Sequence, residues 1–206
     1  MYWQKKRLKY DILVPPISKP FKKFTPKEAE DFFQWYISQI DSRVRYLQDY
    51  SGVELDYTVD SLIDIWEWFI KNAEIEKTPQ KKINELKKDL KKQPANFARD
   101  ILNEQSKQFT LETEYIINDI VMYFGEVYVR NNSSIIWGYS TDKKARGSVN
   151  EPVLIGFKDR DFDPPARVDF QINQLIHIVA DGILCGDPKK EDLFEQYYLW
   201  QGMVFN

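Results

Sequence analysis

Apolar positions are densest between Thr110 and Phe157, and their period changes partway through this segment. Residues 115–124 are apolar on nearly every side of a helix and are interrupted mainly by Asn118 and Asp119. A helix that is apolar all round is normally buried on all sides. We therefore predict a central buried helix that begins near Thr110 and ends at Gly125, because glycine readily adopts the left-handed conformation that closes helices.

The residues after Gly125 have the shorter period of strands. Three runs rich in β-branched and aromatic residues follow one another at 127–130, 135–139 and 153–157, with turn residues between them. A polar, charged loop at 141–151 joins the second run to the third. This pattern predicts a small antiparallel sheet of three to four strands that follows the central helix.

Helical periodicity dominates the segment before the central helix. Residues 25–28, Thr-Pro-Lys-Glu, have the form of a capping box with proline at the first helical position, and the helix they begin should run to Tyr50 and be closed by Gly52. Thr58 or Asp60 should cap a second helix that packs antiparallel to the first. Residues 79–93 predict a third helix, and residues 95–109 suggest a short fourth one.

Two further helices should close the structure. The first is predicted to begin at Asp163-Pro164, to include Val168 and to end at Gly186, and Asp187-Pro188 should begin the last. The prolines in residues 1–24 predict an extended arm, with a possible short edge strand at 10–14.

These patterns together predict an α+β fold, a predominantly helical single domain with a small antiparallel sheet. We divide residues 1–206 into the extended arm at 1–24, an N-terminal helical part at 25–93, and a part at 94–206 that holds the central helix, the β-meander and the closing helices. An apolar content of 43% is enough to fill a sizeable core.

Composition excludes few functions but constrains the compartment. The net charge is −3, although residues 1–27 carry eight basic residues against one acidic residue and the next segment is acidic. The single cysteine allows no disulfide within the chain. The longest apolar run near the start is too short for a secretory signal, and no run is long enough to cross a membrane. We expect a cytoplasmic protein that does not bind membranes.

Catalytic motifs are missing from the sequence. It contains no phosphate-binding glycine loop, no paired cysteines, no zinc-protease motif and no nucleophile elbow, and we expect no cofactor. His177 is the only histidine, in a polar stripe that we place on one helix with Asp169, Asn173, Asp181 and Cys185. Asp181 could orient His177 as a general base. We favour a solvent-facing helix side instead, because no matching nucleophile accompanies it.

The carboxylates of the central helix allow a second enzymatic interpretation. Glu112, Glu114, Asp119 and Glu126 lie along this helix and the residues after it, and paired carboxylates serve glycoside hydrolysis or bind divalent metals. Asp119 falls inside the apolar run, where a carboxylate needs partners. We expect it to bond a tyrosine or an arginine such as Arg130 and to fix the geometry of the core.

Lysines cover most of the third predicted helix, from Lys81 to Lys92, and could contact phosphate backbones. No aromatic residue is interleaved with these lysines, as binding to single strands would require. We therefore favour a solvated face over nucleic-acid binding.

The predicted strands and loops offer a surface for another protein. Trp137 and Tyr139 alternate onto one face of a strand, which is either core or an exposed partner surface. The charged loops at 141–151 and 158–163 contribute Arg146, Arg160 and Asp161. These five residues are our candidate binding residues.

Part of the chain resembles a known pattern. Residues 123–130, then Trp137, residues 151–154 and Asp163-Pro164 resemble uncharacterised bacterial proteins in which a helix, a Gly-Glu-Val strand, a tryptophan strand and a Pro-Val strand lead to closing helices. The resemblance covers about residues 110–200. It implies a small interaction protein of the toxin-immunity kind and no catalytic residues. Our hypothesis is a non-catalytic protein that binds another protein; an enzyme using His177 or the carboxylates near Asp119, and nucleic-acid binding, remain alternatives.

Overall fold

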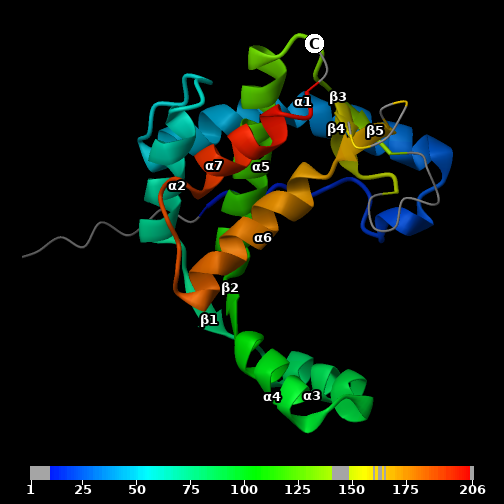
Figure 1. Ribbon diagram of the computed structural model, residues 1–206, viewed down its shortest axis with the longest axis vertical. Coiled ribbons are helices and arrows are strands. Elements are labelled where there is room, and N and C mark those ends of the chain that lie inside the picture. Colours follow the sequence, from blue (N-terminus) through cyan, green and yellow to red (C-terminus); the bar gives the residue numbers. More distant parts are fainter. Residues whose placement is uncertain (1–9, 141–148, 160, 162–163, 165, 205–206) are drawn as a thin grey trace, which may run out of the picture.

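The computed structural model describes residues 10–140, 149–159, 161, 164 and 166–204. The elements of these described residues are helices and short strands in an α+β arrangement (Figure 1). In chain order they are η1 (Phe21–Lys23), α1 (Pro26–Ser51), α2 (Ser61–Asn72), β1 (Ile75–Lys77), α3 (Gln80–Asp89), η2 (Leu90–Lys92), α4 (Ala95–Glu104), β2 (Lys107–Phe109), α5 (Leu111–Asn131), β3 (Ile136–Tyr139), β4 (Pro152–Asp159), β5 (Ala166–Phe170), α6 (Ile172–Cys185) and α7 (Asp192–Gln201).

Helix α5 is the centre of the fold, as the apolar run predicts. Residues from Ile116 to Phe124 are buried except Asn118, and α1 and α6 both pack against this helix. The side chain of Thr110 caps its N-terminus by accepting a hydrogen bond from the backbone N–H of Thr113. The prediction that this segment lies deep inside the protein is confirmed.

The predicted end of this helix at Gly125 is wrong, and so is the strand at 127–130. Helix α5 continues through Gly125 to Asn131, and Val127 and Tyr128 are completely buried helical residues. The apolar positions on both sides of Gly125 keep the i, i+3 and i, i+4 spacing of a helix, and burying them favours continuing it. Gly125 instead provides space for the indole of Trp137.

The first helix follows its predicted signals closely. Thr25 and Glu28 form both hydrogen bonds of the capping box at the start of α1, and Gly52 closes the helix with a φ of 71°. Helix α2 begins after Asp60, whose side chain forms no cap; the hydroxyl of Thr58 accepts the backbone N–H of Ser61 instead, at 3.3 Å.

The larger sheet has three antiparallel strands in the order β3-β4-β5. Two of its strands were predicted, but β5 occupies residues that we assigned to a helix. Val168 pairs with Phe157 of β4, and α6 begins only at Ile172. Residues 166–170, Ala-Arg-Val-Asp-Phe, alternate apolar and polar positions, which is the period of a strand with one buried face.

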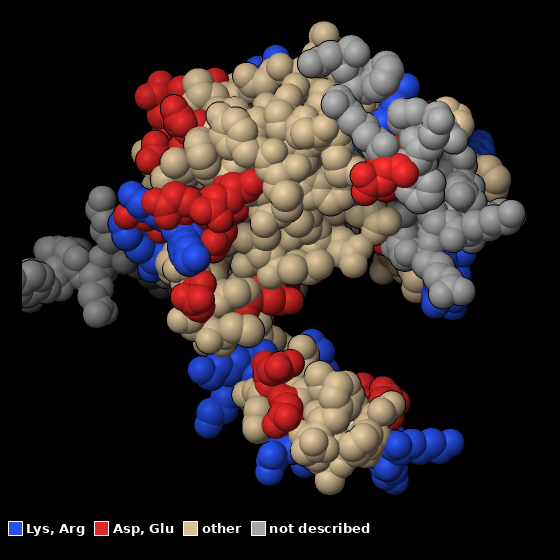
Figure 2. Space-filling model, in the orientation of Figure 1, with Lys and Arg blue, Asp and Glu red and all other residues tan. Residues whose placement is uncertain are grey.

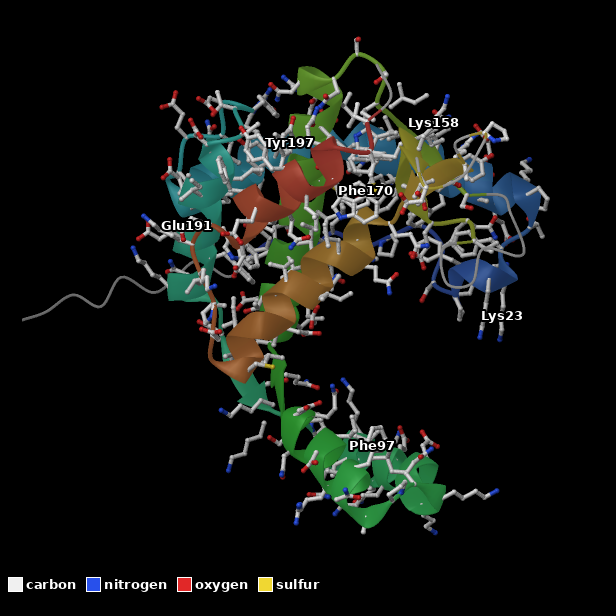
Figure 3. All side chains as sticks on the ribbon, in the orientation of Figure 1. Lys23, Phe97, Lys158, Phe170, Glu191 and Tyr197 are labelled. Carbon is white, nitrogen blue, oxygen red and sulfur yellow. The ribbon has the colours of Figure 1, made fainter. Side chains whose placement is uncertain are left out.

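The sheet joins the main core through aromatic residues. The rings of Tyr128 and Tyr197 stack with centroids 4.3 Å apart, and the hydroxyl of Tyr128 donates to the backbone carbonyl of Tyr197 at 2.5 Å. Phe170 stacks on Trp200 with centroids 4.1 Å apart (Figure 3 labels Phe170 and Tyr197). These contacts hold α7 against α5 and the sheet.

A second, two-stranded sheet was not predicted. Strands β1 and β2 are three residues each and pair antiparallel, so that Ile75 lies opposite Phe109 and Lys77 opposite Lys107. They form a stalk that carries α3 and α4 away from the rest of the protein, below it in Figure 1. We call residues 78–106 the hairpin and the other described residues the body. Three-residue strands are too short for their period to be read from sequence.

The arm at 10–20 has no regular secondary structure, so the possible edge strand at 10–14 does not form. Tyr10 is nevertheless 2% exposed and anchors the arm in the core. Among the described helices, none combines the length and apolar character needed to span a bilayer.

Candidate binding sites

The structure places the predicted binding residues unequally. Trp137 and Tyr139 lie side by side on one face of β3, half-buried against α1. The indole N–H of Trp137 donates to Glu126 at 2.9 Å, and the hydroxyl of Tyr139 donates to Glu30 at 2.6 Å. Asp161 is exposed just after β4, and Arg146 and Arg160 lie outside the described residues.

Asp119 forms a buried ion pair in the body. Its carboxylate accepts hydrogen bonds from Nε of Arg43 at 2.9 Å and from Nη2 at 2.6 Å, and the hydroxyl of Tyr10 donates to it as well. The expected partners, a tyrosine and an arginine, are thus both present, but the arginine is Arg43. Arg130 instead pairs with Glu126 at 3.1 Å and lies over the ring of Tyr57.

This contact ties the arm to the helices. Arg43 also donates to the backbone carbonyl of Asp11 at 3.0 Å, and the backbone N–H of Tyr10 donates to Glu112 at 2.8 Å. Burial raises the pKa of Asp119, while the hydrogen bonds and charge of Arg43 act in the opposite direction. Burial, together with the carboxylate of Asp119, also raises the pKa of Tyr10.

A cleft of about 350 Å³ lies beside Asp119. Its wall is formed by the arm, the first half of α1, the first half of α5, the start of β4 and the first turn of α6. The wall is mostly apolar and aromatic, and includes Phe21, Phe32, Trp35, Tyr36, Tyr115 and Met122. Three carboxylates, those of Glu114, Asp119 and Glu151, also line it. This is the size and composition of a small-molecule site.

Glu151 is the unusual member of this wall. It is half-buried, and no residue in the described part of the chain forms a hydrogen bond or an ion pair with its side chain. Burial raises the pKa of Glu151. A carboxylate in this position gains from a positively charged ligand, because no described residue offsets its desolvation.

His177 lies near a carboxylate of the central helix, and within the described residues no hydrogen bond joins it to Asp181. Its Nδ1 lies 3.7 Å from Oε2 of Glu114, and a third of its side chain is exposed. The predicted polar stripe is shorter than expected, since Asp169 belongs to β5. Within the described residues, no hydroxyl or thiol donates to His177, and Cys185 is an exposed free thiol.

The hairpin is the second candidate site. None of the residues of α3 or α4 is buried, although Ile83, Leu86, Ile101 and Leu102 give the two helices facing apolar sides. Phe97 is 49% exposed, and it lies far from Phe170 and Tyr197 of the body (Figure 3). A helix pair that buries so little is stabilised weakly by its own contacts.

Charge separates the hairpin region from the body. Residues 77–107 carry nine lysines and arginines against four acidic residues, whereas the rest of the chain carries 20 against 28. In Figure 2 uncharged atoms occupy the middle of the hairpin, and Lys and Arg stand at its edges together with fewer Asp and Glu. The same view shows a broad uncharged face over α6 and α7. On these two helices, Ile178, Tyr198 and Leu199 are each more than half exposed.

Comparisons of the chain with known proteins identify no relative. No protein-family model, curated protein or solved structure matches the chain. The resemblance of residues 110–200 to bacterial interaction proteins therefore stays a prediction, and one of its features, a Gly-Glu-Val strand, is helical here. The described residues contain no group of three or more side chains placed to hold a metal ion.

Proposed function

We propose that this chain is a non-catalytic binding protein whose hairpin binds an acidic partner protein. The observation that carries the proposal is the exposure of the hairpin: its two helices have apolar sides, yet none of their residues is buried. Exposed apolar surface with a charged rim is typical of protein interfaces. A partner seated on the hairpin would bury Phe97 and complete the small core between α3 and α4.

Charge complementarity selects the kind of partner. The basic rim of the hairpin would attract an acidic surface and speed the encounter, and the apolar centre would supply most of the affinity. A nucleic acid fits less well, because contacts between lysines and phosphates would leave the apolar centre exposed, and single strands need aromatic residues among the lysines. Phe97 is the one aromatic residue in the hairpin sequence, and it lies on α4, whereas the lysines lie on α3 and η2.

The uncharged face over α6 and α7 supports a second contact with the same partner. It lies on the side of the molecule that also presents the uncharged middle of the hairpin (Figure 2). Inhibition by an immunity-like protein requires only binding of this sort, and we propose that role, in the cytoplasm, as the finer form of the function.

Photo-crosslinking tests the proposal. A photoreactive phenylalanine analogue at Phe97 should capture an acidic polypeptide in cells, and the same analogue at Tyr198 should capture the same polypeptide. The matched control is the exposed position Asp49 on α1, which should not. Capture of RNA at position 97, of a second copy of this chain, or of the same species at positions 97 and 49 would contradict the proposal.

A charge variant gives an independent check. Replacing Lys87, Lys88 and Lys91 by glutamate reverses three exposed charges of the rim and leaves the apolar centre intact. The captured polypeptide should associate with this variant at least tenfold more slowly at low salt, with a smaller difference at high salt. An unchanged rate at low salt would remove the electrostatic part of the proposal.

A further inference from the structure

The cleft beside Asp119 has walls suited to a cation with an apolar body. Phe32, Trp35 and Tyr36 of α1 line one side, Tyr115 of α5 lines another, and Phe21 of η1 completes the aromatic lining. The faces of aromatic rings carry negative charge density and attract cations, most strongly where water is displaced. The same rings offer apolar contact area to the rest of a ligand.

The charges in the cleft have one sign. Among the described lining residues there are three carboxylates and no lysine or arginine. Arg43, which is not among the described lining residues, neutralises Asp119, and Glu114 lies 3.7 Å from His177, whose side chain is one third exposed. Glu151 has no partner among the described residues. Within the part of the chain that the structure describes, the carboxylate of Glu151 therefore has no counter-charge, and aromatic rings line the same cleft.

We propose that this cleft binds a small organic ammonium compound, with the ammonium group at Glu151 and the apolar body against Trp35 and the neighbouring rings. A bare metal ion would lack oxygen ligands on the apolar side of the cleft. An anion would be repelled by the carboxylates, and a neutral apolar ligand would leave the half-buried carboxylate of Glu151 without a positive partner among the described residues. A volume of about 350 Å³ accommodates a ligand of this class.

The test uses a pair of probes that differ only in charge. Calorimetric titration with 2-phenylethylammonium should give a dissociation constant at least about tenfold lower than titration with 2-phenylethanol, because a charged hydrogen bond in a half-buried site is worth a factor of that order. The anion 3-phenylpropanoate should bind more weakly than either. Equal affinity for the ammonium and the alcohol, or no binding of the ammonium, would overturn the proposal.

Two variants assign the effect to the cleft. Glu151→Gln keeps the size of the side chain and should remove the preference for the ammonium over the alcohol while leaving the affinity for the alcohol unchanged. The matched control Glu76→Gln, on the exposed strand β1, should keep the full preference. If Glu151→Gln kept the preference for the ammonium over the alcohol, the charge at Glu151 would not select the ligand. The same would follow if Glu151→Gln and Glu76→Gln lost this preference equally.

Discussion

The indole ring of Trp137 lies directly against the backbone of Gly125, in the space that any side chain at position 125 would fill. A Cβ built on Gly125 would overlap Cζ2 and Cη2 of the indole. The contact joins strand β3 to the middle of α5, and the hydrogen bond from Trp137 to Glu126 fixes the orientation of the ring. Gly125 is therefore a packing glycine inside a helix, and α5 continues past it.

This relationship predicts that Gly125→Ala destabilises the protein. Alanine at a helix interior is favoured by about 1 kcal/mol, but forcing extra atoms into a packed core costs about 1–3 kcal/mol. We expect a net loss in the free energy of unfolding, measured in urea. The loss should shrink when Trp137 is replaced by phenylalanine, which lacks the overlapping ring atoms.

The control for this substitution is another glycine inside a helix. A Cβ at Gly182 of α6 would meet no atom within 4 Å. Gly182→Ala should therefore gain up to about 1 kcal/mol. If both alanine variants changed stability in the same direction, the close approach of Trp137 would not be the deciding contact.

The buried pair of Arg43 and Asp119 predicts a large loss when one partner is removed. Arg43→Met leaves an uncompensated carboxylate in the core and should cost about 3–5 kcal/mol of unfolding free energy at neutral pH. Replacing both residues, as in Arg43→Met with Asp119→Leu, should cost much less than the sum of the single changes. Additive losses would indicate that the two side chains do not act as a pair.

The same variant should respond to pH in a defined direction. Without Arg43, the hydrogen bond from Tyr10 is left as the contact that lowers the pKa of Asp119, and burial, the largest influence, raises this pKa further, so protonating the carboxylate favours the folded state. The penalty is therefore full above that pKa and decreases as the pH falls through it. Urea unfolding at a series of pH values should show the wild type and Arg43→Met converging toward acid.

For Glu28 we predict the opposite pH dependence of its contribution to stability. Its hydrogen bond with Lys19, and its bond with the backbone of Thr25 in the capping box, lower its pKa to about 2, compared with about 4.3 in an unfolded chain. Its contribution to stability is present above about pH 4.3 and is lost as the pH falls through 2. A titration of the Glu28 carboxyl by NMR should show a midpoint near 2, and Lys19→Met should raise it. A midpoint unaffected by Lys19→Met would refute the role of the ion pair.

The exposure of the hairpin predicts that the body folds without it. Lys77 and Lys107 lie opposite each other in the stalk, so an Asn-Gly turn can join them and replace residues 78–106. Because the hairpin contributes no buried residue, its removal should change the free energy of unfolding by about 0.5 kcal/mol, as surface changes do. The melting temperature of the body should therefore shift by only a few degrees. Calorimetry showing loss of the folding transition would mean that the hairpin stabilises the body.

The sequence predicts the elements better than their limits. The capping box at Thr25 and the apolar run before Gly125 both rest on local chemistry, and both predictions are confirmed. A glycine inside an apolar run is ambiguous, because the close approach of Trp137 is a contact between segments that the local pattern does not contain. Val168 was assigned to a helix although its neighbours alternate in polarity as a strand does.

The candidate sites are harder to predict from the sequence than the helices and strands are. A buried arginine could have been found, because Arg43 lies beside Val44 and between Ile40 and Leu47 on the apolar face of α1. Asp119 needs a positively charged partner in the core, and the position of Arg43 on this apolar face indicates that Arg43 could be that partner. The sequence around Glu151 and Phe97 does not indicate their roles. The position of Glu151 depends on the packing of five segments into a cleft, and the exposure of Phe97 depends on helices that contact little else.

Removing the hairpin tests the central claim most directly. The polypeptide captured at position 97 should be purified and titrated, by calorimetry, against the wild type, the chain shortened at Lys77 and Lys107, and Glu151→Gln. We predict that the shortened chain, with its body folded, loses about a hundredfold or more in affinity, because the hairpin would carry the main binding residues, and that Glu151→Gln binds as the wild type does. Equal affinity for the shortened chain and the wild type would contradict the account.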